Sequence, residues 1–126
     1  MNGPSKWTRL TGAMALALAA GPALAEWQRL DGDGIVEALS GSEVDYNGAA
    51  WQEFLPSGRT FYRVGEAPPG GTSRGDWRAE AGSFCSRWPP RDDWTCYAVE
   101  VDGAGGIRFI DTWGNISEGR FVGVAE

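Results

Sequence analysis

The side chains of this sequence that could do chemistry gather in one stretch, residues 84–97. It holds the only two cysteines of the chain, Cys85 and Cys96, on either side of a Pro-Pro pair. A redox-active thiol pair is typical of a Cys-x-x-Cys motif, and the spacing in this stretch is wider. We therefore predict a β-hairpin closed by a structural Cys85–Cys96 disulfide.

Direct opposition of the two cysteines also predicts which side chains share a face of the hairpin. Because alternate residues of a strand point to opposite faces, Arg87 and Trp94 would lie opposite each other on the cysteine face. We expect the guanidinium group of Arg87 to stack on the Trp94 ring as a cation–π pair. The other face carries Phe84, Trp88 and Tyr97 and is the predicted core side.

Two adjacent carboxylates, Asp92 and Asp93, lie in the turn of this hairpin. Glycosidase chemistry needs two carboxyl groups that face each other across a cleft, roughly 5–10 Å apart. Neighbours on an exposed turn point into water, so we predict no catalytic site there. Together with Arg87, Arg91 and Trp94 they form the predicted partner-binding surface, because Trp and Arg are enriched at protein interfaces.

The first 25 residues have the pattern of a secretory signal peptide. Lys6 and Arg9 give a basic start, residues 10–20 form a short apolar run, and Ala23 and Ala25 are the small residues of a cleavage site. A membrane-spanning helix would need about 20 apolar residues. We expect cleavage after Ala25, a periplasmic or secreted protein with no membrane span after cleavage, and a single β-rich domain over residues 26–126.

The composition excludes several classes of chemistry and of partner. The chain has no histidine, and Lys6 in the leader is its only lysine, which removes His-based triads, Schiff bases and most zinc, copper and haem sites. Loss of the leader takes away two of eleven basic residues and none of seventeen acidic ones, which leaves a net charge of −8. Such a chain is a poor nucleic-acid binder, although a basic protein partner remains possible.

A calcium site is also weighed and set aside. The Asp-Gly-Asp-Gly run at residues 31–34 resembles the start of an EF-hand loop. That loop needs Asp or Asn at its fifth position and Glu at its twelfth, and this chain has Ile35 and Ser42 there. We predict no metal, no cofactor and no enzymatic activity, with an Asp/Glu hydrolase left open.

The elements that position the hairpin are a short helix and a series of strands. Ile35 and Leu39 fall on one helical face, Asp31 or Asp33 can cap the helix, and Gly41 can end it. After the helix come short β-rich segments separated by turn signals, of which Asn-Gly is the strongest. Strands are expected at 44–46, 49–54, 59–64, 76–80, 95–101, 107–111 and 120–124, besides the first strand of the hairpin.

This pattern predicts a mainly β fold. A short N-terminal helix would precede an antiparallel meander of about eight strands, which form a small barrel or a sandwich. Tryptophans outside the leader could line a ligand cavity in such a barrel or fill its core. There are six of them: Trp27, Trp51, Trp77, Trp88, Trp94 and Trp113.

Short motifs follow one another along most of the chain after the leader: Leu39-Ser40-Gly41, Phe54-x-x-x-Gly58-x-x-x-Tyr62, Gly75-Asp76-Trp77, Cys85-x-x-Trp88-Pro89-Pro90, Trp94-x-Cys96-Tyr97 and Ile107-x-Phe109. In their order the chain resembles a family of small uncharacterised secreted proteins of Gram-negative bacteria, a domain of unknown function. The resemblance implies periplasmic export and a β-rich fold. The general shape is also similar to lipocalin-like and avidin-like barrels.

Three functions agree with these features. The first is a non-enzymatic binding or interaction module. The second is a periplasmic protein inhibitor of a basic cell-wall enzyme, similar to a lysozyme inhibitor. The third is a small barrel that binds an apolar ligand. A monomer is expected in each case, and the presence of a cavity inside the sheet would distinguish between them.

Overall fold

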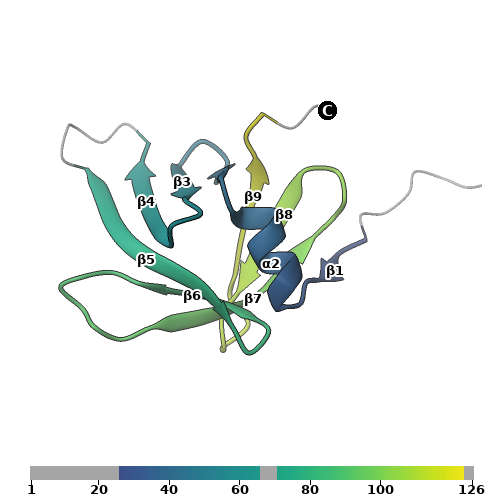
Figure 1. Cartoon of the computed structure of the whole chain (residues 1–126). Helices are drawn as coiled ribbons and strands as arrows, with labels where there is room; N and C mark the ends of the chain where they lie inside the picture. Colours follow the sequence, from purple (N-terminus) through teal and green to yellow (C-terminus); the bar gives the residue numbers. More distant parts are fainter. Residues whose placement is uncertain (1–25, 66–70, 124–126) are drawn as a thin grey trace, which may run out of the picture.

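A computed structural model of the chain describes residues 26–65 and 71–123 (Figure 1). The predicted leader and its cleavage after Ala25 lie outside these residues. The described part contains one helix and nine strands: β1 (Gln28–Arg29), α2 (Gly32–Leu39), β2 (Ser42–Asp45), β3 (Ala50–Phe54), β4 (Arg59–Val64), β5 (Thr72–Glu80), β6 (Ser83–Arg87), β7 (Thr95–Val101), β8 (Gly106–Ile110) and β9 (Ile116–Phe121).

Strands β2 to β9 form an up-and-down antiparallel barrel. Each strand pairs with the next one along the chain, and β2 pairs with β9 at Val44 and Phe121, so the sheet closes. Strand β1 adds to the outside of this order by pairing with the end of β7 at Val101. The predicted fold class is confirmed, and of its two forms the closed barrel is the one adopted.

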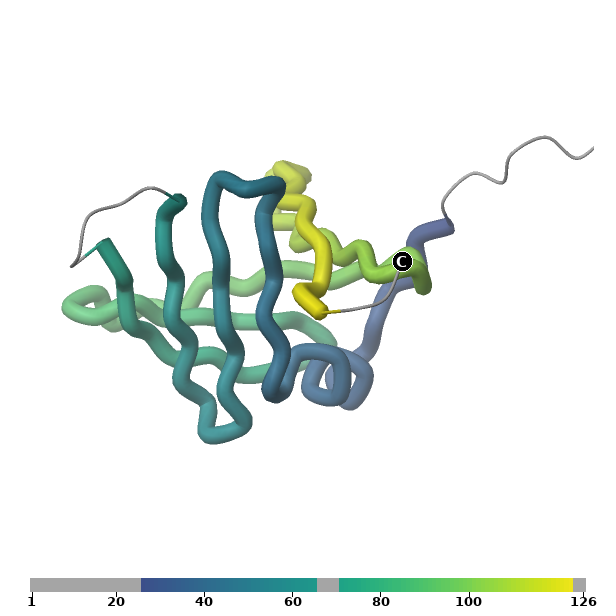
Figure 2. Tube along the Cα trace, turned by 90° about the horizontal axis from the view of Figure 1, so that it is seen from above, coloured from purple at the N-terminus to yellow at the C-terminus, as the bar shows by residue number. Residues whose placement is uncertain are grey.

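Helix α2 covers one end of the barrel. The Asp31 carboxylate accepts a hydrogen bond from the Gly34 amide at 2.8 Å and caps the helix, and Gly41 follows it with a φ of 79°. Ile35 and Leu39 are fully buried, where the helix contacts the end of β5 and the starts of β6 and β2. In Figure 2 the helix lies at the bottom of the view, and the turn between β2 and β3 lies at the top.

The turns follow the predicted signals. Asn47-Gly48 and Ala81-Gly82 each have two consecutive residues with positive φ, the conformation that joins two strands tightly. The prediction of a last strand over 120–124 is wrong, because β9 begins at Ile116. The Asp111 carboxylate accepts hydrogen bonds from the amides of Trp113 and Asn115, which makes the turn short and returns the chain directly to β8.

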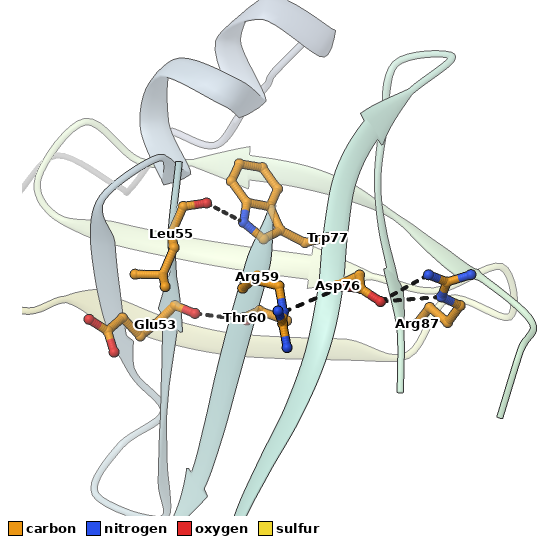
Figure 3. Close-up of polar contacts among 7 residues, drawn as sticks. All are labelled: Glu53, Leu55, Arg59, Thr60, Asp76, Trp77 and Arg87. Atoms are coloured by element: carbon orange, nitrogen blue, oxygen red, sulfur yellow. Dashed lines mark hydrogen bonds and ion pairs between the residues drawn. The ribbon is translucent and has the colours of Figure 1, made fainter. Parts of the chain in front are cut away.

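The apolar core fills the helix end of the barrel. Trp77 is part of it, and its indole N–H donates to the carbonyl oxygen of Leu55 at 2.9 Å, so that its one polar group is paired (Figure 3). The core comes from inward positions of the strands and from the helix: Ile35, Leu39, Val44, Phe54, Trp77, Phe84, Val99, Ile107 and Phe109.

Candidate functional site

The barrel contains a cavity at the end opposite the helix. Its volume is about 460 Å³, within the range of small-molecule sites in proteins. Ser117 and Glu118 in its lining are exposed, so the cavity reaches the surface. Ten residues line it: Tyr46, Gln52, Tyr62, Phe84, Ser86, Trp88, Tyr97, Phe109, Ser117 and Glu118.

Aromatic rings form most of the cavity wall. Six rings follow one another, and each ring centroid lies between 6.0 and 6.4 Å from the next. In this order they are Trp88, Tyr62, Tyr46, Phe109, Tyr97 and Phe84. They come from strands that are far apart in the sequence, so only the closed barrel brings them together.

Two glycines inside strands make room for two of these rings, Trp88 and Tyr46. A Cβ atom on Gly75 would lie 2.6 Å from Cε3 of Trp88, so the indole ring occupies the space that any other residue would fill. A Cβ atom on Gly119 would lie 3.1 Å from Cδ1 of Tyr46 and even closer to a Val44 methyl group. A glycine inside a strand often marks such a close approach.

A chain of hydrogen bonds fixes the polar part of the wall. Tyr46 Oη donates to Gln52 Oε1 at 2.8 Å, Gln52 Nε2 donates to Thr60 Oγ1 at 2.9 Å, and Thr60 donates to the Glu53 carbonyl oxygen (Figure 3 shows this last bond). The single hydroxyl proton of Thr60 is used, so Thr60 must accept from Gln52. The Tyr46 proton is therefore used as well, and its oxygen can only accept from anything else in the cavity.

Two tyrosine hydroxyls of the cavity, those of Tyr46 and Tyr97, have raised pKa values. Burial raises the pKa of Tyr46 above its ordinary value, and the neighbouring Tyr62 and Tyr97 add to this shift. Burial also raises the pKa of Tyr97, with a further contribution from the negative charge of Asp111. Glu118 is the only acidic residue in the described lining, and its pairing with Arg108 turns its side chain to the outer face of β9.

A smaller recess of about 250 Å³ adjoins the cavity. Tyr62 and Trp88 line both spaces, and the recess also contains Ser73, Arg74 and Pro89. The recess therefore brings a basic residue, Arg74, next to the cavity.

The hairpin residues predicted to share the cysteine face lie outside this cavity. Cys85 and Cys96 are directly opposite each other and form the predicted disulfide. Arg87 stacks on Trp94 as expected, with its guanidinium carbon 4.9 Å from the ring centroid. Arg78 covers the same ring at 3.9 Å, a contact that the sequence did not indicate. All of these side chains are on the outer wall of the barrel.

The charged groups of the hairpin turn are largely paired with one another. Arg87 binds Asp76 at 3.0 Å (Figure 3) and lies 3.5 Å from Asp92. Arg91 binds Asp93 at 3.0 Å, and this hydrogen bond lowers the pKa of Asp93. The structure thus brings the five predicted partner-binding residues to one end of the hairpin, and their role in binding stays a prediction.

The six tryptophans divide between several environments. Trp77 is in the core, Trp88 lines the cavity, and Trp113 is 83% exposed in the turn before β9. Trp27 and Trp51 lie under arginine side chains. Neither a filled core nor a ring of tryptophans around a ligand describes the whole set.

The sequence predicted the direction of the cavity residues better than their role. Phe84 and Tyr97 face inward and pack with the core as expected, and they also line the cavity. Tyr46, Gln52 and Tyr62 were not recognised as site residues. The sequence signal for these residues was a glycine inside a strand. Gly75 lies against Trp88, and Gly119 lies against Tyr46.

Among residues 26–65 and 71–123, no group of three or more acidic or cysteine side chains is placed to hold a metal ion. No helix in the same ranges is long and apolar enough to cross a membrane. No family model matches the chain, and neither a curated protein nor a solved structure matches it. The resemblance to secreted bacterial proteins therefore stays a prediction, and the cavity itself has to carry any proposal of function.

Proposed function

We propose that this protein binds a small organic molecule in the open end of its barrel, without chemical change. The observation that carries this proposal is the cavity of about 460 Å³ walled by six aromatic rings. Ligand sites of this kind are concave and mostly aromatic, with a few polar groups that orient the ligand. Here the hydroxyls of Tyr46 and Ser86 are such groups.

The chemistry of the lining supports binding more than catalysis. A hydrolase that uses two acids would need two carboxylates facing each other in the cavity, and Glu118 is the only acidic residue in the described lining. Asp92 and Asp93 are exposed on the hairpin turn outside the cavity. The hydroxyls of Tyr46 and Tyr97, whose pKa values are raised by burial, are poor general bases at neutral pH.

We place ligand binding ahead of the interaction module and the enzyme inhibitor. Those two functions would use the hairpin turn, where Arg87 and Arg91 already pair with aspartates of the same chain. The site of action that goes with our proposal is the periplasm or the outside of the cell. The Cys85–Cys96 disulfide supports export, because such bonds persist in oxidising compartments.

A thermal-shift screen of the purified protein against a small-molecule library tests the proposal. A ligand present at 100 times its Kd stabilises the folded state by about 2.7 kcal/mol, so we expect a rise in Tm of roughly 10–20 °C for a domain of this size. The variant Ser117→Phe narrows the mouth of the cavity and should abolish the shift.

Ser57→Phe is the matched control, because Ser57 is exposed in the turn at the helix end. It should respond to ligands as the unchanged protein does. A library without any binder, or a binder equally tight on Ser117→Phe, would overturn the proposal.

A further inference from the structure

Ser86 carries a buried hydroxyl group on the wall of the cavity. It pairs with the core residue Trp77 on the inner face of the sheet, and its exposed fraction is 4%. Its oxygen accepts a hydrogen bond from Nε1 of Trp88 at 3.1 Å. A hydroxyl also has a proton to donate, and among residues 26–65 and 71–123 no acceptor binds the proton of Ser86. This proton is therefore available to an acceptor inside the cavity.

The burial of Ser86 distinguishes its hydroxyl from the others of the lining. Buried polar groups in folded proteins are almost always hydrogen-bonded, and a buried donor without a partner destabilises the fold. The hydroxyls of Tyr62, Tyr97 and Ser117 also have no acceptor within the described part of the chain, but these residues are less buried and water can serve them. A ligand that supplies an acceptor therefore gains most at Ser86.

The charged residues around the cavity point away from it. Glu118 pairs with Arg108, and its side chain is on the outer face of β9. Arg74 of the adjoining recess pairs with Phe61, whose neighbour Tyr62 lines the cavity, so the same alternation places Arg74 on the outer face of β5. A charged ligand would lose its hydration in this cavity without gaining a partner of opposite charge, which is unfavourable.

We propose that the cavity selects an uncharged, largely apolar compound with a carbonyl-type oxygen, and that the Ser86 hydroxyl donates a hydrogen bond to this oxygen. This inference rests on the proposed ligand-binding function and names the class of its ligand. The apolar part of the compound packs against the aromatic wall, and the oxygen fixes its orientation.

Four naphthalene derivatives of nearly the same flat shape test the inference. The ketone 2-acetylnaphthalene carries the acceptor, and the alkene 2-isopropenylnaphthalene has a CH₂ group in its place. An anion and a cation take the same position in 2-naphthoate and 2-naphthamidine. All four are titrated into the labelled protein and followed by NMR shifts of the cavity residues. We expect the ketone to bind about fivefold more tightly than the alkene, the effect of one hydrogen bond, and more tightly than either ion.

Two serine variants locate the hydrogen bond. Ser86→Ala removes the donor and should lower the affinity of the ketone to that of the alkene. The alkene should bind this variant and the unchanged protein alike, which checks that the cavity keeps its shape. The carbonyl stretching band of the bound ketone should lie at lower frequency in the unchanged protein than in Ser86→Ala. Ser83→Ala removes a hydroxyl from the outer face of the same strand, where Ser83 pairs with Glu80, and should leave both affinities unchanged.

The outcomes separate the two proposals. Equal binding of ketone and alkene, or a preference for the ketone that Ser86→Ala retains, would overturn the acceptor inference and leave the ligand-binding function in place. Tighter binding of either ion would do the same. If none of the four binds, the ligands found in the library screen replace them. A charged ligand, or one whose affinity Ser86→Ala does not change, overturns the inference, and a neutral one weakened by that variant supports it. Failure of the probes and of the screen together would overturn both.

Discussion

At the scale of single residues, glycines decide where the cavity side chains stand. The inward position at Gly75 would, with any larger residue, bring an atom within 2.6 Å of both the Arg87 carbonyl oxygen and the Trp88 ring. The Arg87 backbone and the Trp88 indole ring leave little room for a larger side chain at position 75 to move away. The shape of the cavity therefore depends on a residue that does not line it.

Gly75→Ala should move Trp88 away from the wall of the barrel. We expect a loss of about 1–3 kcal/mol in the free energy of unfolding, the usual cost of overpacking, and a loss of ligand shifts in the cavity. Urea unfolding and NMR measure the two effects. Gly32→Ala is the control, because nothing lies within 4 Å of its added methyl group. Equal behaviour of the two variants would contradict this account of Trp88.

Tyr46 should make the protein sensitive to alkali. Its pKa is raised in the folded state, so above pH 10, the ordinary value, the unfolded chain loses a proton that the folded chain keeps. The stabilisation is fully present below pH 10 and declines as the pH rises toward the folded pKa. Urea unfolding from pH 7 to 11 should show this decline.

The variant Tyr46→Phe isolates that effect. It should unfold about 1 kcal/mol more easily at pH 7, because Gln52 loses its hydrogen-bond donor, and it should lose less stability between pH 9 and 11. Tyr97, whose pKa is also raised, keeps part of the slope. Identical slopes in the two proteins would argue against the assignment to Tyr46.

At the scale of elements, the hairpin of β6 and β7 was the most predictable part of the chain. Its register follows from local alternation and from two cysteines that must meet, so the inward and outward faces could be derived. Helix α2 was predictable for the same reason, since Asp31 and Gly41 are signals within one segment. Strand β9 was misplaced because two of its inward positions are Ser117 and Gly119, which give no apolar alternation.

Replacing both cysteines by serine should destabilise the barrel without closing its ligand site. Closing a loop of this length contributes about 3 kcal/mol in the chain-entropy model, so Tm should fall by roughly 10–20 °C. The sulfur atoms lie on the outer wall, and ligand affinity below the transition should stay within twofold of its original value. A reductant should lower the Tm of the unchanged protein and not that of the variant. A large loss of affinity would assign the disulfide a direct role in the site.

The buried face of α2 should account for most of what the helix contributes. Leu39→Ala removes a fully buried side chain and should cost about 2–5 kcal/mol in the free energy of unfolding. Val36 is 46% exposed on the same helix, and Val36→Ala should change stability by less than about 0.5 kcal/mol. Chemical denaturation compares them. Similar costs for both would mean that the helix does not close the barrel in solution.

At the scale of the whole molecule, the closure of the sheet was beyond the sequence. A meander of eight strands fits a sandwich or a barrel, and the choice depends on the pairing of Val44 with Phe121, which are separated by most of the chain. The cavity could not be predicted from the sequence either. It needs the registers of several hairpins to bring Tyr46, Trp88 and Tyr97 to one end, and no single segment encodes that.

Export is the prediction that belongs to the whole chain. Expressed with its leader in a Gram-negative bacterium, the protein should appear in the periplasmic fraction with Glu26 as its first residue. Osmotic shock followed by intact-mass measurement checks both points. A mutated leader with Leu16→Arg and Leu18→Arg should hold the protein in the cytoplasm with the disulfide reduced. Retention of the intact leader in the unchanged protein would contradict the prediction.

The separation between the filled and the hollow end of the barrel has a consequence for its evolution. Of the described residues that line the cavity, only Phe84 and Phe109 also belong to the buried core cluster. Mutations at Tyr62, Trp88 or Ser117 can therefore change what is recognised while the helix end keeps the chain folded. Such a barrel can pass from one ligand to another through folded intermediates, and a library randomised at these positions offers the same route in the laboratory.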